Sequence, residues 1–185
     1  STAGGLPEHA SSVERDGFVR KYDPAGNHLW TRQFGTNDID EAHGVAVDGT
    51  GVYVAGTTDG VFPGQTTFHI GSYDAFLAKL DTVGNQVWAR QVYSTAGTGN
   101  DEEGWAVAVG SAGVYLVGTT TGFLPGQTCT GFVDGFVRQY DKDGGEGWTS
   151  QICGTPFGSE AARGVAVDAG GVYVAGDMGT QLPGL

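Results

Sequence analysis

The strongest constraint on this chain is an internal repetition that runs through nearly its whole length. A segment that begins at Asp16 recurs at Asp74 and again at Asp134, a spacing of about 60 residues. Each copy has the pattern Asp-(Gly or Ala)-Phe-(Val or Leu), and a tryptophan and a Gly-Val-Tyr segment follow it in the same phase. Repetition at a fixed period of this size indicates a repeat architecture, in which stacked copies share a core.

One copy of the repeat has the pattern of four short strands joined by tight turns. Residues 44–48 and 51–56 flank an Asp-Gly-Thr-Gly turn, and residues 74–81 and 86–93 flank a second turn with Gly and Asn. No segment has the sustained i, i+3, i+4 spacing of apolar residues that indicates a helix. The strands carry apolar residues on both faces, which suits a sheet that lies between two others. We therefore predict an all-β fold, a β-propeller built of four-stranded antiparallel blades, with the tryptophans packing one blade on the next.

The chain holds about three blades' worth of sequence in a single segment, 1–185. The repeats span approximately 16–73, 74–133 and 134–185, and residues 1–15 form the tail of a preceding repeat. Closed propellers have about 4–8 blades. The chain is therefore expected to be a partial propeller from a longer protein, or half of a ring that two copies close. Its partners would then include the remaining blades or a second copy of the chain.

The repeated residues resemble those of the SBBP repeat, a bacterial β-propeller repeat family. The resemblance rests on Asp-(Gly or Ala)-Phe-Val, the Trp-x-Arg-Gln segment, Gly-Val-Ala-Val-Asp and Gly-Val-Tyr-Val-Ala-Gly, and it covers essentially the whole chain in three copies. The second copy departs at Gly110, which replaces the turn aspartate, and at Leu80, which replaces tyrosine. The resemblance implies a propeller from a secreted or cell-surface protein of bacteria or archaea, and it implies no activity.

The charge of the chain excludes several kinds of partner. The formal net charge is −12. A nucleic acid needs a basic face and an anionic membrane surface attracts basic segments, so neither is an expected partner. No apolar run reaches the ~20 residues that span a bilayer, so membrane insertion is not expected either.

In an up-and-down blade, alternate connections lie at opposite ends. The short turns share one end, which we call the short-turn face. The other end, the long-loop face, holds residues 35–43, 57–73, 94–105, 119–133 and 154–163, and the copies differ in length there. Variable loops on a rigid scaffold commonly carry function, so this face is the predicted binding face.

The long-loop face carries a cluster of acids that suggests a weak candidate metal site. Hard cations such as Ca²⁺ bind several carboxylate oxygens, and calcium is the one cofactor the sequence suggests. The alternative, which we favour, is that these are solvated loop acids whose hydrogen bonds fix the entry to the inner strand. The candidates are Asp38, Asp40, Glu41, Asp101, Glu102, Glu103 and Glu160.

Four other residues of this face are candidate ligand-binding residues. His43, Trp105 and Arg163 occupy one repeat position, and His69 lies in a long connection. We expect Phe62 and Phe123 to anchor their loops rather than to bind sugars. The four histidines have no zinc-site spacing, and the chain has no repeated Ser/His/Asp set and no nucleophile-elbow motif.

These patterns predict a non-catalytic extracellular or cell-surface module, structural or adhesive, that binds a protein or a polysaccharide through the long-loop face. The alternative is a hydrolase or lyase that acts on a carbohydrate polymer in the propeller funnel. Cys129 and Cys153 fall near each other across a predicted hairpin, so they are a candidate disulfide, with two buried thiols as the alternative. A disulfide would favour an oxidising, extracellular compartment.

Overall fold

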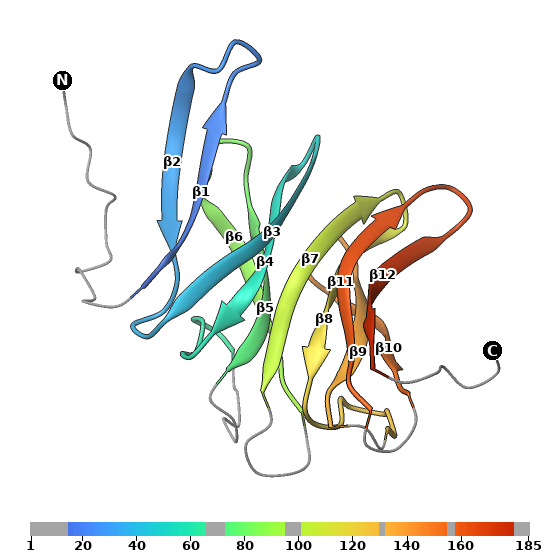
Figure 1. Ribbon diagram of the computed structural model, residues 1–185. Coiled ribbons are helices and arrows are strands. Elements are labelled where there is room, and N and C mark those ends of the chain that lie inside the picture. Colours follow the sequence, from blue (N-terminus) through green and yellow to red (C-terminus); the bar gives the residue numbers. More distant parts are fainter. Residues whose placement is uncertain (1–14, 66–72, 95–100, 130–131, 155–157, 180–185) are drawn as a thin grey trace.

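The computed structural model describes residues 15–65, 73–94, 101–129, 132–154 and 158–179. Within these ranges the chain forms twelve strands and no helix (Figure 1). The strands are β1 (Gly17–Tyr22), β2 (His28–Phe34), β3 (Asp40–Asp48), β4 (Gly51–Thr58), β5 (Asp74–Leu80), β6 (Gln86–Val92), β7 (Glu102–Gly110), β8 (Gly113–Thr120), β9 (Asp134–Tyr140), β10 (Glu146–Ile152), β11 (Glu160–Val167) and β12 (Val172–Met178). No helix in the described part is long and apolar enough to cross a membrane.

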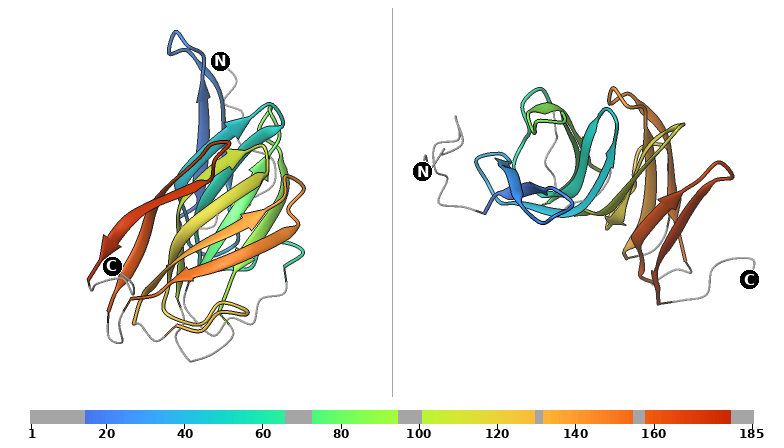
Figure 2. Two further views of the ribbon diagram at one scale, coloured as in Figure 1. Left: turned by 90° about the vertical axis from the view of Figure 1, so that its right-hand side faces the viewer. Right: turned by 90° about the horizontal axis from the view of Figure 1, so that it is seen from above.

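The strands form two complete four-stranded sheets, with a two-stranded hairpin on either side (Figure 2). Sheet order follows the sequence, β3-β4-β5-β6 and β7-β8-β9-β10, and every neighbouring pair is antiparallel. By repeat position, β1–β2 corresponds to β5–β6, and β11–β12 corresponds to β3–β4. The predicted β-propeller fold is confirmed, as two whole blades between two half-blades.

The two whole blades share one buried core. Tyr53 and Leu77 of the first sheet lie in a cluster with Leu116 and Phe136 of the second. Trp88, on strand β6, closes this cluster: its ring centroid is 6.2 Å from that of Tyr53, and its indole N–H donates to the carbonyl of residue 142 at 3.3 Å. Trp88 therefore packs one blade on the next, as predicted.

A repeat position that is buried in a whole blade is exposed in a half-blade. Phe76 and Phe136 have no exposed surface, whereas their counterpart Phe18 in β1 is 65% exposed. Tyr53 is fully buried, whereas its counterpart Tyr173 in β12 is 57% exposed. In the described part of the chain, β1 pairs only with β2 and β12 only with β11. Each half-blade thus presents apolar positions that a complete propeller covers.

The turns that join the third and fourth strands of a blade are each held by one aspartate. The Asp81 carboxylate accepts the backbone N–H groups of Val83 and Asn85, at 3.0 and 2.8 Å, and the Asn85 side-chain amide at 2.9 Å. These bonds, that of the Asn85 backbone first, lower the pKa of Asp81. Gly84 takes a φ of 90°, which suits glycine. The same turn recurs at Asp23 and Asp141, so the short-turn face is nearly constant between copies.

A repeated glutamine joins the outermost strand to the long connection. The Gln151 amide donates to the Gly122 carbonyl at 2.9 Å and to the Asp134 carboxylate at 3.0 Å, and its carbonyl accepts the Leu124 N–H at 3.2 Å. Gln91 makes the same three contacts in the preceding blade. Both glutamines are buried. The glutamine of the repeated Trp-x-x-Gln segment therefore has a structural role, because its buried hydrogen bonds join two parts of the same blade.

Cys129 and Cys153 form a disulfide, with their Cα atoms 5.6 Å apart. Cys153 directly follows β10, and Cys129 lies in the long connection between β8 and β9. The pairing of Ile152 with Gly135 brings these two segments together. The covalent link therefore acts at the same place as the Gln151 contacts and ties the long connection of the second blade to its outermost strand.

Candidate functional site

The candidate residues lie where the inner strands β3, β7 and β11 begin, at the long-loop end of the blades (Figure 1). Two acids stand next to each other at the start of β3 and again at the start of β7. Side chains alternate between the faces of a strand, so two adjacent acids point in opposite directions. The acids of the long-loop face therefore fall into two groups with different surroundings.

One group is buried and structural. Asp40, Glu102 and Glu160 occupy one repeat position and are at most 2% exposed. Each accepts the backbone N–H of the preceding connection: Asp40 that of Thr36 at 2.6 Å, Glu102 that of Ser94 at 3.1 Å, and Glu160 that of residue 154 at 3.0 Å. The contacts bear out the favoured interpretation of these acids as hydrogen-bonding groups at the entry to the inner strand. The expectation that they are solvated was wrong for these three, because the inner-strand start is covered by the preceding connection.

Burial makes ionisation of Asp40 and Glu102 costly. Desolvation, the largest cause, raises the pKa of Glu102 to about 7, against the bonds that it accepts from Thr120 and Ser94. The Thr120 hydroxyl donates to Glu102 at 2.6 Å. Desolvation also raises the pKa of Asp40. Glu102 therefore changes its charge close to neutral pH.

The remaining acids do not converge on a metal site within the described residues. Asp38 is exposed and Asp101 is half-buried, whereas Glu41 and Glu103 line the pocket described below. In that part of the chain, the one group with three potential metal-ligating side chains is Cys129, Asp134 and Cys153, and its two cysteines form the disulfide. Calcium binding stays a prediction, and His69 lies outside the described residues.

His43, Trp105 and Arg163, predicted as ligand-binding residues, come together in one stack. The ring centroids of His43 and Trp105 are 4.7 Å apart with an interplanar angle of 17°. The Arg163 guanidinium carbon lies 4.8 Å from the centre of the Trp105 ring. His43 and Arg163 come from β3 and β11, the strands on either side of β7. One repeat position therefore forms a continuous stack across three blades.

A β-bulge places each residue of the stack. The register between β3 and β4 passes from Ala42 to Gly44 and leaves out His43. The register between β7 and β8 leaves out Trp105, and that between β11 and β12 leaves out Arg163. A bulge redirects a side chain and is common next to functional sites. The sequence pattern did not predict these bulges. The alternation of small and apolar residues in the Gly-Val-Ala-Val segment is regular, and it does not reveal the extra residue that precedes the segment.

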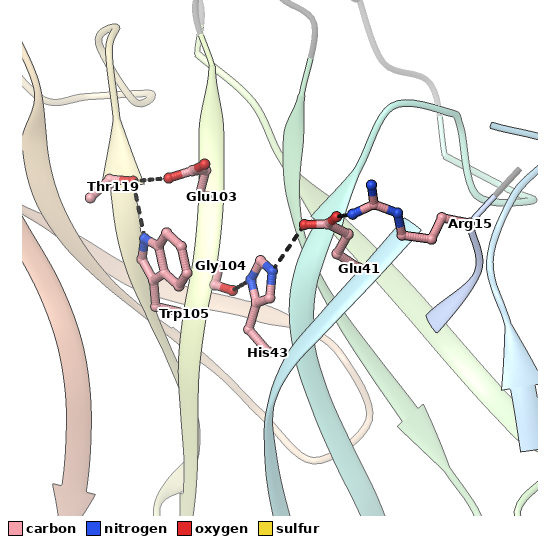
Figure 3. Close-up of polar contacts among 7 residues, drawn as sticks. All are labelled: Arg15, Glu41, His43, Glu103, Gly104, Trp105 and Thr119. Carbon is pink, nitrogen blue, oxygen red and sulfur yellow. Dashed lines mark hydrogen bonds and ion pairs between the residues drawn. The ribbon is translucent and has the colours of Figure 1, made fainter. Parts of the chain in front are cut away.

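Polar contacts fix the stack at its edges (Figure 3). A ring nitrogen of His43, Nδ1, lies 2.9 Å from the Gly104 carbonyl. The indole N–H of Trp105 donates to the Thr119 hydroxyl at 3.3 Å, and this hydroxyl donates to Glu103 at 3.2 Å. Arg163 donates to Asp177 at 2.8 Å. Each residue of the stack is therefore held by a different partner.

A carboxylate accompanies the stack in every blade, although its position changes. Strand pairing places Glu41 opposite Thr57 and Glu103 opposite Thr119. In the last blade Ala161 replaces the glutamate, and its opposite residue is Asp177. In this blade the carboxylate therefore belongs to Asp177, on the strand opposite, and it accepts a hydrogen bond from Arg163. The carboxylate lies beside a cation in the first and third blades, where Glu41 pairs with Arg15 and Asp177 with Arg163, whereas Glu103 of the second blade accepts a hydrogen bond from Thr119.

A pocket of about 250 Å³ opens between the first two blades, beside the stack. Glu41 contacts Arg15 as an ion pair at one side of the pocket, and His43 Nε2 lies 3.4 Å from Glu41 (Figure 3). The residues that line the pocket include Glu41, His43, Thr57, Tyr73, Glu103 and Trp105. The pocket combines acidic, aromatic and hydroxyl side chains, and two of its residues belong to the stack.

The two predicted loop anchors have different outcomes. Phe62 is 1% exposed and packs on Phe76 with a centroid distance of 5.1 Å, as predicted. The prediction for Phe123 was wrong, because this ring is 42% exposed and Leu124 is the buried residue of that loop. Leu124, not Phe123, directly precedes a proline as Phe62 does. Leu124 is therefore the counterpart of Phe62 in the second long connection.

The comparisons with known proteins agree with this architecture. Residues 29–63, which run from β2 past the end of β4, match the family model of the SBBP β-propeller repeat. Within these residues the chain carries an SBBP repeat. The chain is also similar to "Regulatory protein FlaEY" of Caulobacter vibrioides (strain ATCC 19089 / CIP 103742 / CB 15), with 30% identity over 159 residues. The match covers 83% of the chain and 16% of the length of that protein.

Proposed function

We propose that this SBBP segment is a non-catalytic binding module, structural or adhesive, whose long-loop face binds a protein or a polysaccharide. One observation carries the proposal. His43, Trp105 and Arg163, which occupy one repeat position and differ in every copy, gather at one end beside a pocket. The opposite end consists of turns that are nearly the same in every copy. This division between a constant scaffold and a variable face is typical of binding modules.

The proposed location is extracellular or on the cell surface. The disulfide between Cys129 and Cys153 supports it, because such bonds persist in oxidising compartments. The relative FlaEY is named a regulatory protein. Regulation through bound partners is a role that a non-catalytic propeller can serve.

Completion of the propeller is part of the proposal. The exposure of Phe18 and Tyr173 in the half-blades supports the proposal that partners supply further strands there. These partners are either the remaining blades or a second copy of the chain. The β12 edge has the repeat position of β4, and the β1 edge that of β5. The pairing of β4 with β5 therefore gives the expected register for a composite blade.

The test is binding of the labelled chain to a glycan array and to a matched array of bacterial surface-protein fragments. Arg163→Gln on the long-loop face should abolish or strongly weaken binding. Lys21→Gln, on exposed β1, removes the same charge away from that face and should leave binding intact. Equal effects of the two variants contradict the proposed face. Release of shortened glycans, detected by mass spectrometry, would favour the hydrolase or lyase instead.

A further inference from the structure

We infer that the pocket between the first two blades binds the ammonium group of a lysine side chain on a protein partner. This inference rests on the proposed function and specifies the ligand chemistry. Its components are the two pocket carboxylates, an unused buried hydroxyl, and a stack that leaves no aromatic face open.

The charge in the pocket is not balanced. Glu41 and Glu103 both line it, and Arg15 pairs with Glu41. Within the described residues, Glu103 accepts a hydrogen bond from Thr119, and no ion pair of Glu103 is present there. One carboxylate therefore lacks a cation, in a chain whose net charge is −12. A monovalent cation from outside would supply it.

The buried hydroxyl of Thr57 is the second and independent observation. Thr57 lines the same pocket and is 6% exposed, and its hydroxyl oxygen has no hydrogen-bond partner among the described residues. A buried hydroxyl without a partner is unfavourable by about 1–3 kcal/mol, so native structures rarely leave one. Its counterparts in the other blades both have partners: Thr119 contacts Trp105 and Glu103, and Asp177 binds Arg163. Among the three equivalent residues, only the Thr57 hydroxyl therefore lacks a hydrogen-bond partner within the described part of the chain, and Thr57 lines the pocket.

An alkylammonium matches these groups in the number of hydrogen-bond donors that they can accept. A lysine ammonium has three N–H donors and no acceptor, and Glu41, Glu103 and Thr57 offer acceptor oxygens. Tyr73 and the edge of Trp105 supply apolar wall for the slender side-chain stem. Calcium is a poorer match, because it takes about 6–8 oxygen ligands.

The stack argues against a sugar as the occupant. A pyranose ring binds to an open aromatic face, whereas the Trp105 ring is already covered by His43 and by Arg163, from the strands on either side of it. What remains of Trp105 for the pocket is its edge. The faces of Trp105, one of the predicted ligand-binding residues, are therefore taken up by contacts within the chain.

The test is a titration of the complete chain with Nα-acetyl-lysine amide, followed through the Trp105 indole N–H signal by NMR. The signal, assigned by its loss in Trp105→Phe, should shift and saturate. The Nε-acetylated form of the same probe, which is neutral, should give no saturable shift, and CaCl₂ and sodium chloride should not reproduce it. No shift with the lysine probe, or an equal shift with its acetylated form, overturns the inference. A stronger response to glucosamine overturns the choice of a protein partner.

Two variants separate a binding role from a structural one. Glu103→Gln should weaken binding of the lysine probe roughly tenfold, because it removes one charge-assisted hydrogen bond. Asp143→Asn, the same charge change at an exposed position of the short-turn face, should leave it unchanged. Thr57→Val should weaken binding about fivefold while thermal stability stays equal or rises, because the hydroxyl it removes bonds to nothing. Loss of stability without loss of binding in Thr57→Val would contradict the inference.

The failure of this inference is distinguishable from that of the proposed function. If the array experiment finds a ligand lost in Arg163→Gln but unaffected by Glu103→Gln, the binding face stands and the lysine pocket is wrong. If the lysine probe saturates while the arrays show no ligand on the long-loop face, the pocket stands and the proposed face lacks support.

Discussion

Glu102 should make the stability of this chain fall as the pH rises from about 4.5 to about 7, and Glu102→Gln should remove this contribution. The side chain is 1% exposed, and desolvation raises its pKa from 4.5 to about 7. Each pKa unit corresponds to about 1.4 kcal/mol at 25 °C, so ionisation of the folded chain costs about 3 kcal/mol. The cost is large relative to the ~5–15 kcal/mol that stabilise a typical domain.

The sign of the change in the free energy of unfolding with pH depends on whether the folded or the unfolded chain holds the Glu102 proton. Below pH 4.5, Glu102 is protonated in both states and the pH has no effect through it. Between pH 4.5 and about 7 the unfolded chain has released this proton and the folded chain still holds it, so the free energy of unfolding falls as the pH rises. Above about pH 7 the full destabilisation remains. Glutamine fits the site, because its amide can donate to Thr120 and its carbonyl can accept the Ser94 N–H.

Urea unfolding at pH 5, 6, 7 and 8, followed by tryptophan fluorescence, measures the effect. The two proteins should have similar stability at pH 5, and the variant should be more stable by up to about 3 kcal/mol at pH 8. A smaller slope should persist in the variant, since burial also raises the pKa of Asp40 and Asp134. Parallel curves for the two proteins would refute the reasoning, because Glu102 would then ionise alike in both states.

Three further perturbations test the scaffold. Gln151→Ala should lower the free energy of unfolding by about 2 kcal/mol, because it leaves a buried carbonyl, amide and carboxylate without this partner, while Gln86→Ala, at an exposed position, should change it by less than about 0.5 kcal/mol in the same urea titration. Replacing Cys129 and Cys153 by serine should cost about 3 kcal/mol for a loop of this length, and mass measurement of the alkylated parent should find no free thiol without reductant. Gly118→Ala should lower stability by about 3 kcal/mol by calorimetry, since its Cβ would meet the Glu103 carbonyl oxygen at 1.9 Å, and an unchanged melting temperature would contradict the close strand approach.

The fold was predictable because the repeat supplied the same evidence several times. The turn at Asp81 and the strands on both sides of it were visible in the sequence as Asp-x-x-Gly-Asn between apolar runs, and the structure has them in place. The burial of Trp88 and of both faces of β5 followed from apolar residues at alternate and intervening positions. These features depend on local pattern and on repetition, which a single sequence contains.

The site was predictable only in part. Comparison of the copies identified His43, Trp105 and Arg163 as one variable position, but not that they contact each other, because the bulges that redirect them leave no mark in the alternation. The different roles of Glu102 and Glu103 also depend on which face of β7 each occupies. The role of the repeated glutamines went unnoticed, since their partners lie about 30 residues away in the chain.

The stack of His43, Trp105 and Arg163 has a consequence for how such a protein can arise by duplication. Freshly duplicated copies would place identical side chains against each other at this position, and three arginines in contact would repel one another. Three identical arginines are therefore unfavourable at this position, whereas the imidazole, the indole and the guanidinium of the present copies pack in one stack. Substitutions at this position should be inherited in compatible sets, so that each copy constrains the next along the gene.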